Sequence, residues 1–206
     1  MFLKRVWYLL WTTSAISLGA GMVLWGILKT IEPSFIFMDA RFSRYEVLSM
    51  ILGTITIAII SLVGFLANLF ARYYFIGIFK NRKGVWTGLQ IFFILLAVGD
   101  LFYLRYKHFA APGESMTGYL IMPLAILAVG IIVALWKSQL TNGQAFIPTL
   151  FFMVVLTILE AIPAFQANDL FFTFYMLALL LIGNAWQILI FHKLVDTPVQ
   201  AQKSTG

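Results

Sequence analysis

The stretch from Val47 to Ala71 reads VLSMILGTITIAIISLVGFLANLFA and contains no charged residue. At about 1.5 Å rise per residue, a helix of this length is roughly 37 Å long, which exceeds the ~30 Å hydrocarbon core of a bilayer. Lipid offers the backbone no hydrogen-bond partners, so only helices and closed barrels cross it. Barrel strands would be about half as long and would alternate polar and apolar residues, which this stretch does not do. It therefore predicts a membrane-spanning helix.

Five further stretches are also long, apolar and uncharged or nearly so, and they predict an all-α, polytopic membrane protein with six transmembrane helices in one membrane domain over residues 1–206. The stretch 138–159 opens with the turn residues Thr141, Asn142 and Gly143, so its helix is expected to begin near Ala145. The run 6–28 is longer than the 7 to 15 apolar residues of a cleaved signal sequence, and is expected to remain as the first helix. The predicted spans are 6–28, 47–71, 84–104, 115–136, 145–164 and 170–191.

Composition excludes several classes of function. Hydrophobic residues make up 62% of the chain and charged residues 11%, and the net charge is +6. The basic residues lie at helix ends and form no continuous face, so we expect the lipid bilayer as a partner and not nucleic acid. The chain has no cysteine, and His108 and His192 are predicted on opposite sides of the membrane, so neither a metal site nor a cofactor is expected. Catalytic and phosphate-binding sequence motifs are also absent, so no enzyme is predicted.

The distribution of lysine and arginine predicts the orientation. With a cytoplasmic N-terminus, nine basic residues lie inside and five outside. We therefore predict a multi-pass plasma-membrane protein with both termini in the cytoplasm. The inside residues are Lys4, Arg5, Arg72, Lys80, Arg82, Lys83, Lys137, Lys193 and Lys203; the outside ones are Lys29, Arg41, Arg44, Arg105 and Lys107.

Asp100 and Glu160 are the acidic residues within the predicted spans. A carboxylate at mid-membrane costs about 2.5 to 3.5 kcal/mol on insertion scales, so each needs a partner or a function. Both are predicted at similar depth in the outer third of the membrane, facing one another or a common cavity. One interpretation is a protonation or ion site. The alternative is structural, with each carboxylate paired to Arg105, Arg41 or Arg44 near the outer interface.

Other polar residues are candidates for helix contacts or for a partner surface. Asn68 and Arg72 lie one turn apart on the same helix face, and Gln90 and Asn184 are amides expected to hydrogen-bond helices together. The segment 72–83 is expected to form an interfacial helix or a re-entrant turn on the cytoplasmic side. Its positive charge is either only the signal that keeps this loop in the cytoplasm, or it binds anionic lipid or an acidic surface of a partner. We refer to three of its residues as the basic cluster: Lys80, Arg82 and Lys83.

The segment 61–106 reads SLVGFLANLFARYYFIGIFKNRKGVWTGLQIFFILLAVGDLFYLRY. It resembles the KbaA family, the KinB-signalling pathway activation proteins of spore-forming bacteria. The resemblance lies in Gly64-Phe65 with Ala67, Gly77-Ile78-Phe79, Trp86 with Gln90, and Asp100 through Arg105. It implies a polytopic membrane protein that promotes signalling by the sensor histidine kinase KinB, which feeds the sporulation phosphorelay. It implies no catalytic residues, and it marks 72–83, Asp100 and Arg105 as family-like positions without assigning their roles.

The leading hypothesis is therefore a non-enzymatic membrane regulator that helps a sensor histidine kinase become active. The alternative is a small proton- or ion-coupled transporter that uses Asp100 and Glu160 as coupling acids. A membrane enzyme is a third hypothesis, which the missing motifs disfavour.

Overall fold

The computed structural model describes residues 2–35, 45–78, 83–111 and 113–203. These residues are helical apart from short connections, and no strand occurs among them. Six of the described helical segments are long and apolar enough to cross a membrane, which confirms the predicted fold class. The helical elements in chain order are α1 (Phe2–Ile31), α2 (Glu46–Ile78), α3 (Lys83–Phe109), α4 (Thr117–Leu140), η2 (Gly143–Ala145), α5 (Phe146–Phe151), η3 (Phe152–Leu156), α6 (Thr157–Glu160), α7 (Ile162–Ala167) and α8 (Leu170–Lys203).

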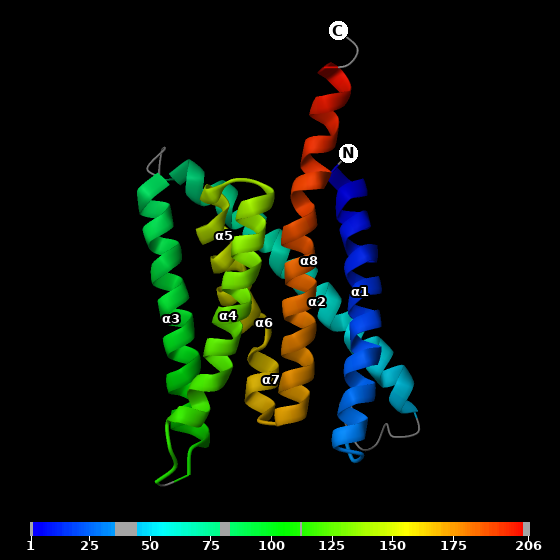
Figure 1. Cartoon of the computed structure of the whole chain (residues 1–206), viewed down its shortest axis with the longest axis vertical. Helices are drawn as coiled ribbons and strands as arrows, with labels where there is room; N and C mark the ends of the chain where they lie inside the picture. Colours follow the sequence, from blue (N-terminus) through cyan, green and yellow to red (C-terminus); the bar gives the residue numbers. More distant parts are fainter. Residues whose placement is uncertain (1, 36–44, 79–82, 112, 204–206) are drawn as a thin grey trace.

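The helices pack as two groups of neighbours. α1, α2 and α8 pack against one another, and α3 packs with α4 and α5. The two groups meet where η3 and α6 contact α2 and α8, and where α4 contacts α8. α1 begins and α8 finishes at the same end of the bundle, together with the α4–α5 connection (Figure 1). We call this end the inner end and the opposite one the outer end.

α2 is longer than the predicted span and tilts across the bundle (Figure 1). Its 33 residues are roughly 50 Å long as a helix, well beyond the ~30 Å hydrocarbon core. Arg72 to Ile78 form its last two turns. The expectation that 72–83 forms an interfacial helix or a re-entrant turn of its own is therefore wrong for residues 72–78. The physical reason is that the segment between Ala71 and Gly77 has no residue that interrupts a helix. Residues 79–82 lie outside the described residues.

The fifth span is discontinuous, unlike the single helix expected over 145–164. After α5 the backbone forms the π-helical turn η3, resumes as α6, and breaks at Ala161 before α7. Pro163 lacks the N–H that would bond to the carbonyl of Leu159, which explains a break at this point. π-Helical turns inside α-helices occur frequently at functional sites.

The connection from α7 to α8 is made by two residues suited to it. Asn168 adopts a left-handed backbone conformation with φ of 50°, which asparagine tolerates better than most residues. Asp169 then accepts a hydrogen bond at 2.8 Å from the backbone N–H of Phe172 and thereby caps the first turn of α8. This turn directs α8 back toward the inner end, so that it crosses the full bundle.

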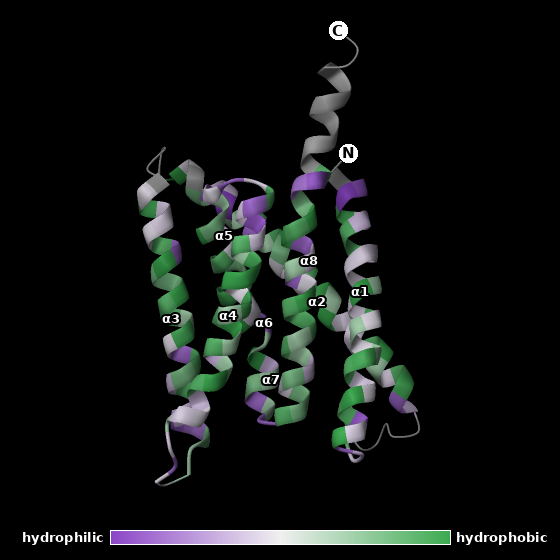
Figure 2. Ribbon diagram, viewed as in Figure 1, coloured by the Kyte–Doolittle hydropathy of each residue, from purple (hydrophilic) through white to green (hydrophobic). Residues whose placement is uncertain are grey.

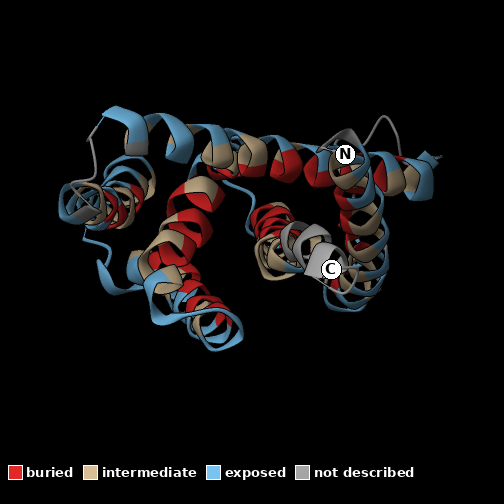
Figure 3. Cartoon of the chain, turned by 90° about the horizontal axis from the view of Figure 1, so that it is seen from above, coloured by how far each residue is buried: buried red, intermediate tan, exposed pale blue. Residues whose placement is uncertain are grey.

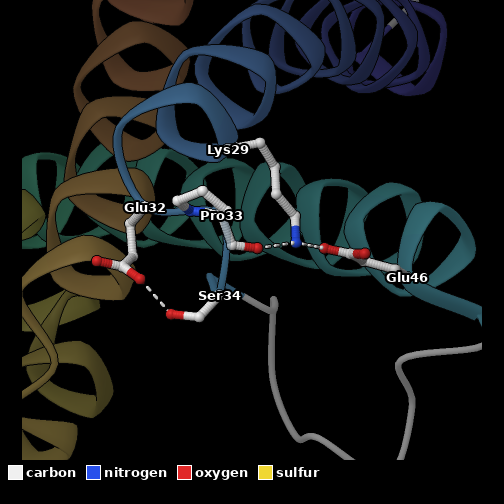
Figure 4. Close-up of polar contacts among 5 residues, drawn as sticks. All are labelled: Lys29, Glu32, Pro33, Ser34 and Glu46. Carbon is white, nitrogen blue, oxygen red and sulfur yellow. Dashed lines mark hydrogen bonds and ion pairs between the residues drawn. The ribbon is translucent and has the colours of Figure 1, made fainter.

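At the outer end, polar contacts join α1 to α2. Lys29 forms an ion pair of 2.5 Å with Glu46 and donates a hydrogen bond of 3.2 Å to the carbonyl of Pro33 (Figure 4). Ser34 also contacts Glu32, and Phe35 is buried against Phe171 and Tyr175. The first part of the outer connection therefore folds over the bundle, while the aromatic and charged residues of 36–44 lie outside the described residues.

The surface of the bundle suits lipid. Hydrophobic residues cover the middle of the helices, and hydrophilic residues gather at their ends (Figure 2). Buried residues line the faces where helices meet (Figure 3). Large apolar side chains on the outward faces stay exposed, such as Trp11 at 62% and Leu95 at 69%. A surface this apolar is stable in contact with acyl chains, so this is a multi-pass membrane protein.

Candidate functional site

A network of hydrogen bonds lies inside the bundle, where α6 meets α2 and α8. The amide nitrogen of Asn184 donates to Oε2 of Glu160 at 3.0 Å and to Oγ1 of Thr157 at 2.9 Å. The hydroxyl of Ser61 donates to Oδ1 of Asn184 at 2.7 Å and accepts from Nε2 of Gln187 at 3.0 Å. Ser61, Asn184, Thr157 and Gln187 are fully buried. We call these four residues, together with Glu160, the buried polar network.

Gly64 on α2 makes room for the carboxylate of Glu160. A Cβ atom at position 64 would lie 1.7 Å from Oε1 of Glu160 and 2.9 Å from its Cδ, closer than real atoms approach. This position tolerates only glycine unless the carboxylate moves. The requirement shows that Glu160 is directed into the helix interface and away from lipid.

The network leaves bonding capacity unused. Oε1 of Glu160 and Oε1 of Gln187 are buried, and neither has a hydrogen-bond partner among the described residues. No described basic residue forms an ion pair with Glu160. An ionised carboxylate without a cation is expensive inside a membrane, so the site suits a bound proton or another small donor. The arrangement can hold a proton, and it joins both helix groups.

A second polar region lies at the inner end, where residues of five helices surround a cavity of about 330 Å³. We call it the inner cavity. α2 contributes Asn68 and Arg72, α3 contributes Gln90, α4 contributes Lys137, and α8 contributes His192. The cavity therefore brings together Asn68, Arg72 and Gln90, which the sequence predicted on two different helices. It adds the basic residues Lys137 and His192.

Lys137 is the most unusual of these residues because its side chain is only 7% exposed. Its Nζ atom lies 3.1 Å from Nδ1 of His192, which binds the last turn of α4 to α8. The backbone N–H of Thr141 donates to the carbonyl of Lys137 at 3.1 Å, and so does its hydroxyl at 2.8 Å, which closes the helix. A buried lysine is uncommon unless it is paired, so this end of α4 is built to hold a positive charge.

A third region is a largely apolar cavity of about 800 Å³ between α3 and the α6–α7 segment. Asp100 and Arg105 both line it. The guanidinium of Arg105 lies 5.5 Å from the ring centre of Phe109 and 5.8 Å from that of Phe165, so it links α3 to α7 by cation–π contacts. We call this region the outer cavity.

The two carboxylates are not brought together. Asp100 is exposed and lines the outer cavity, whereas Glu160 does not line it and contacts α2 and α8. Arg105 forms no ion pair with either acid among the described residues, and Arg41 and Arg44 lie outside them. Neither the shared site nor the pairing with Arg105 is found, because the two acids lie at helix faces that packing turns in different directions.

Other candidates have mixed outcomes. Asn184 bonds helices together as expected of a buried amide. Lys80 and Arg82 of the basic cluster lie outside the described residues, and only the backbone of Lys83 is described, at the start of α3. The sequence did not indicate Ser61, Lys137 or His192 as candidates for a functional site. A single lysine between two apolar runs was the available signal for Lys137, but it also marks an ordinary turn.

Comparison with known proteins agrees with the resemblance of the central segment. The family model described as KinB-signalling pathway activation in sporulation, KbaA, matches residues 19–194. The chain is also similar to the KinB-signaling pathway activation protein of Bacillus subtilis (strain 168), with 34% identity over 169 residues that cover 82% of this chain and 81% of the relative. No solved structure matches the chain.

Proposed function

Because the chain belongs to the family of KinB-signalling pathway activation in sporulation, we propose that it is a non-enzymatic membrane regulator. It promotes activation of a KinB-like sensor histidine kinase that feeds the sporulation phosphorelay. The observation that carries this proposal is the family match over residues 19–194, which reaches from the first span to the end of the sixth. A match that long concerns the whole bundle and not a single shared helix.

The buried polar network supports a mechanism based on helix arrangement. It joins α2 and α8 to α6 of the discontinuous fifth span, at one of the places where the two helix groups meet. Hydrogen bonds of this kind favour one packing of the helices over others. The regulator acts by biasing an equilibrium between two arrangements of the kinase. A bias of about 1 to 3 kcal/mol changes the output of such an equilibrium severalfold or more.

Contact with the kinase takes place in and beside the bilayer. α1 begins and α8 finishes at the inner end, and we assign that end to the cytoplasm of a plasma-membrane protein because the lysine and arginine count of the sequence favours it. Within the membrane, exposed apolar side chains of α1 and α3, such as Trp11 and Leu95, offer surfaces for the helices of the kinase. The segment 72–83, with its basic cluster, contacts the kinase or the anionic lipid around it.

The test is the output of the phosphorelay in the native spore-forming host. The gene is deleted in a strain in which KinB alone feeds the phosphorelay, and a sporulation reporter is measured. Output should collapse and return with the wild-type gene. A strain fed by a different kinase is the control, and its output should stay normal. Normal output in the KinB-dependent strain would refute the proposal.

Direct contact requires its own measurement. Tagged KinB is purified from solubilised membranes, and the co-purified regulator is quantified against a second membrane kinase of similar abundance. We expect enrichment with KinB alone. Equal recovery with both kinases would mean that the regulator acts on the pathway without this contact.

A further inference from the structure

The side chains around the inner cavity are rich in hydrogen-bond donors. Arg72 and Lys137 are cations, and Asn68 and Gln90 carry amide NH₂ groups. None of the described residues that line the cavity is acidic. A cavity with several donors, two cations and no carboxylate in its wall is complementary to an anion.

The contact between Lys137 and His192 adds another donor. A lysine ammonium can only donate, so Nδ1 of His192 accepts in this contact at 3.1 Å. A ring that accepts at Nδ1 is neutral and carries its proton on Nε2, where it can donate. The pair therefore holds a positive charge and a hydrogen-bond donor in one place.

Burial divides the cavity into an accessible side and an enclosed side. Arg72 is exposed, whereas Lys137 and Gln90 are 7% and 2% exposed. Oε1 of Gln90 is buried and has no hydrogen-bond partner among the described residues, so its amide has bonding capacity left. A ligand entering past Arg72 would meet enclosed polar groups rather than an open surface.

We infer that the inner cavity binds a phosphate-type anion. Arginine presents a planar fork of donors that fits phosphate oxygens at two points, and lysine adds a compact charge. The volume of about 330 Å³ lies near the lower end of the 300 to 1,000 Å³ usual for ligand sites, so it fits a head group better than a large molecule. The phosphate comes from the head group of an anionic phospholipid or from a soluble phosphate compound. This inference goes beyond the proposed function and does not depend on it.

The test uses the purified full-length protein in a neutral detergent at constant ionic strength. Its thermal unfolding is followed while phosphatidylglycerol, phosphatidylcholine or inorganic phosphate is added, with sodium chloride as the salt control. Binding raises the unfolding temperature in proportion to occupancy. The variant is Arg72→Gln, and the matched control is Lys4→Gln, which removes an exposed charge at the same end without touching the cavity.

We expect Arg72→Gln to weaken the effective probe by roughly 10- to 150-fold, the loss usual for a hydrogen bond to a charged group. Lys4→Gln should bind like the wild type. Lys137→Gln should weaken binding as well; if that variant does not fold, Arg72→Gln decides alone because its side chain is exposed.

The pattern of probes identifies the source of the phosphate. A response to phosphatidylglycerol alone would establish a lipid head group, and a response to inorganic phosphate would establish a site for soluble phosphate compounds. Two results would overturn the inference. One is an unfolding temperature that neither of these probes raises. The other is an equal loss of binding in Arg72→Gln and Lys4→Gln, which would mean general attraction to a basic surface.

Discussion

Replacing Gly64 by alanine tests the position of the Glu160 carboxylate. The added Cβ would lie 1.7 Å from Oε1 of Glu160, so the carboxylate must move by more than an ångström. The side chain is flexible, but Oε1 is buried and Oε2 accepts the 3.0 Å bond from Asn184. We expect the movement to break this bond and disturb the buried polar network.

The magnitude follows from two costs and one gain. Loss of a hydrogen bond to a carboxylate costs about 1.5 to 3 kcal/mol, and crowding of a packed interface adds about 1 to 3 kcal/mol. Alanine is the better helix former and recovers up to about 1 kcal/mol. Gly64→Ala should therefore lower the free energy of unfolding by roughly 1.5 to 6 kcal/mol. In a Glu160→Ala background the same change should cost less than about 0.5 kcal/mol, because nothing is left to displace.

The assay is SDS-induced unfolding in mixed micelles, followed by circular dichroism, for both single variants and the double variant. Gly99→Ala is the matched control, because no atom of a residue packed against it lies within 4 Å of the added Cβ, and it should cause no loss of stability. Equal costs of Gly64→Ala with and without Glu160 would refute the placement of the carboxylate. So would a Gly64→Ala variant as stable as the wild type.

Three further predictions concern other parts of the molecule. Changing the basic cluster to glutamine should lower KinB output severalfold at a normal protein level in the membrane, whereas Lys107→Gln should not; unchanged output would remove the cluster from the mechanism. Tyr175→Phe deletes the 2.7 Å contact with Thr54 and should cost about 0.6 and at most ~1.7 kcal/mol by SDS unfolding; a gain in stability would contradict this. Asp100→Asn should leave KinB output unchanged, because Asp100 is exposed and forms no ion pair with a described residue; loss of signalling at normal protein levels would show that Asp100 takes part in the regulator's action.

The two polar regions share helices, which matters for how one could affect the other. Ser61 of the buried polar network and Asn68 of the inner cavity lie two turns apart on α2. On α8, Asn184 and Gln187 belong to the network, and His192 belongs to the cavity. A rotation or shift of either helix would alter both regions together.

The sequence by itself determined that this is a helical membrane protein with six spans. Span length and the absence of charge are local properties, and a bilayer imposes the same requirement on every span, so no tertiary contact was needed to find them. It also identified Glu160 as exceptional, since a carboxylate within an apolar stretch is conspicuous at any rotation of the helix. The turn at Thr141 to Gly143 was equally visible, because it depends on local backbone preferences.

Only the tertiary structure decided which polar residues meet. Sequence gives the depth of a residue along its helix, but packing sets the rotation and tilt of that helix. Asp100 and Glu160 were predicted at similar depth, yet they face different surroundings. Asn184 meets Ser61 from a position far along the chain, and Lys137 meets His192 across two helices. These pairings depend on the side-by-side fit of whole helices, which no local pattern records.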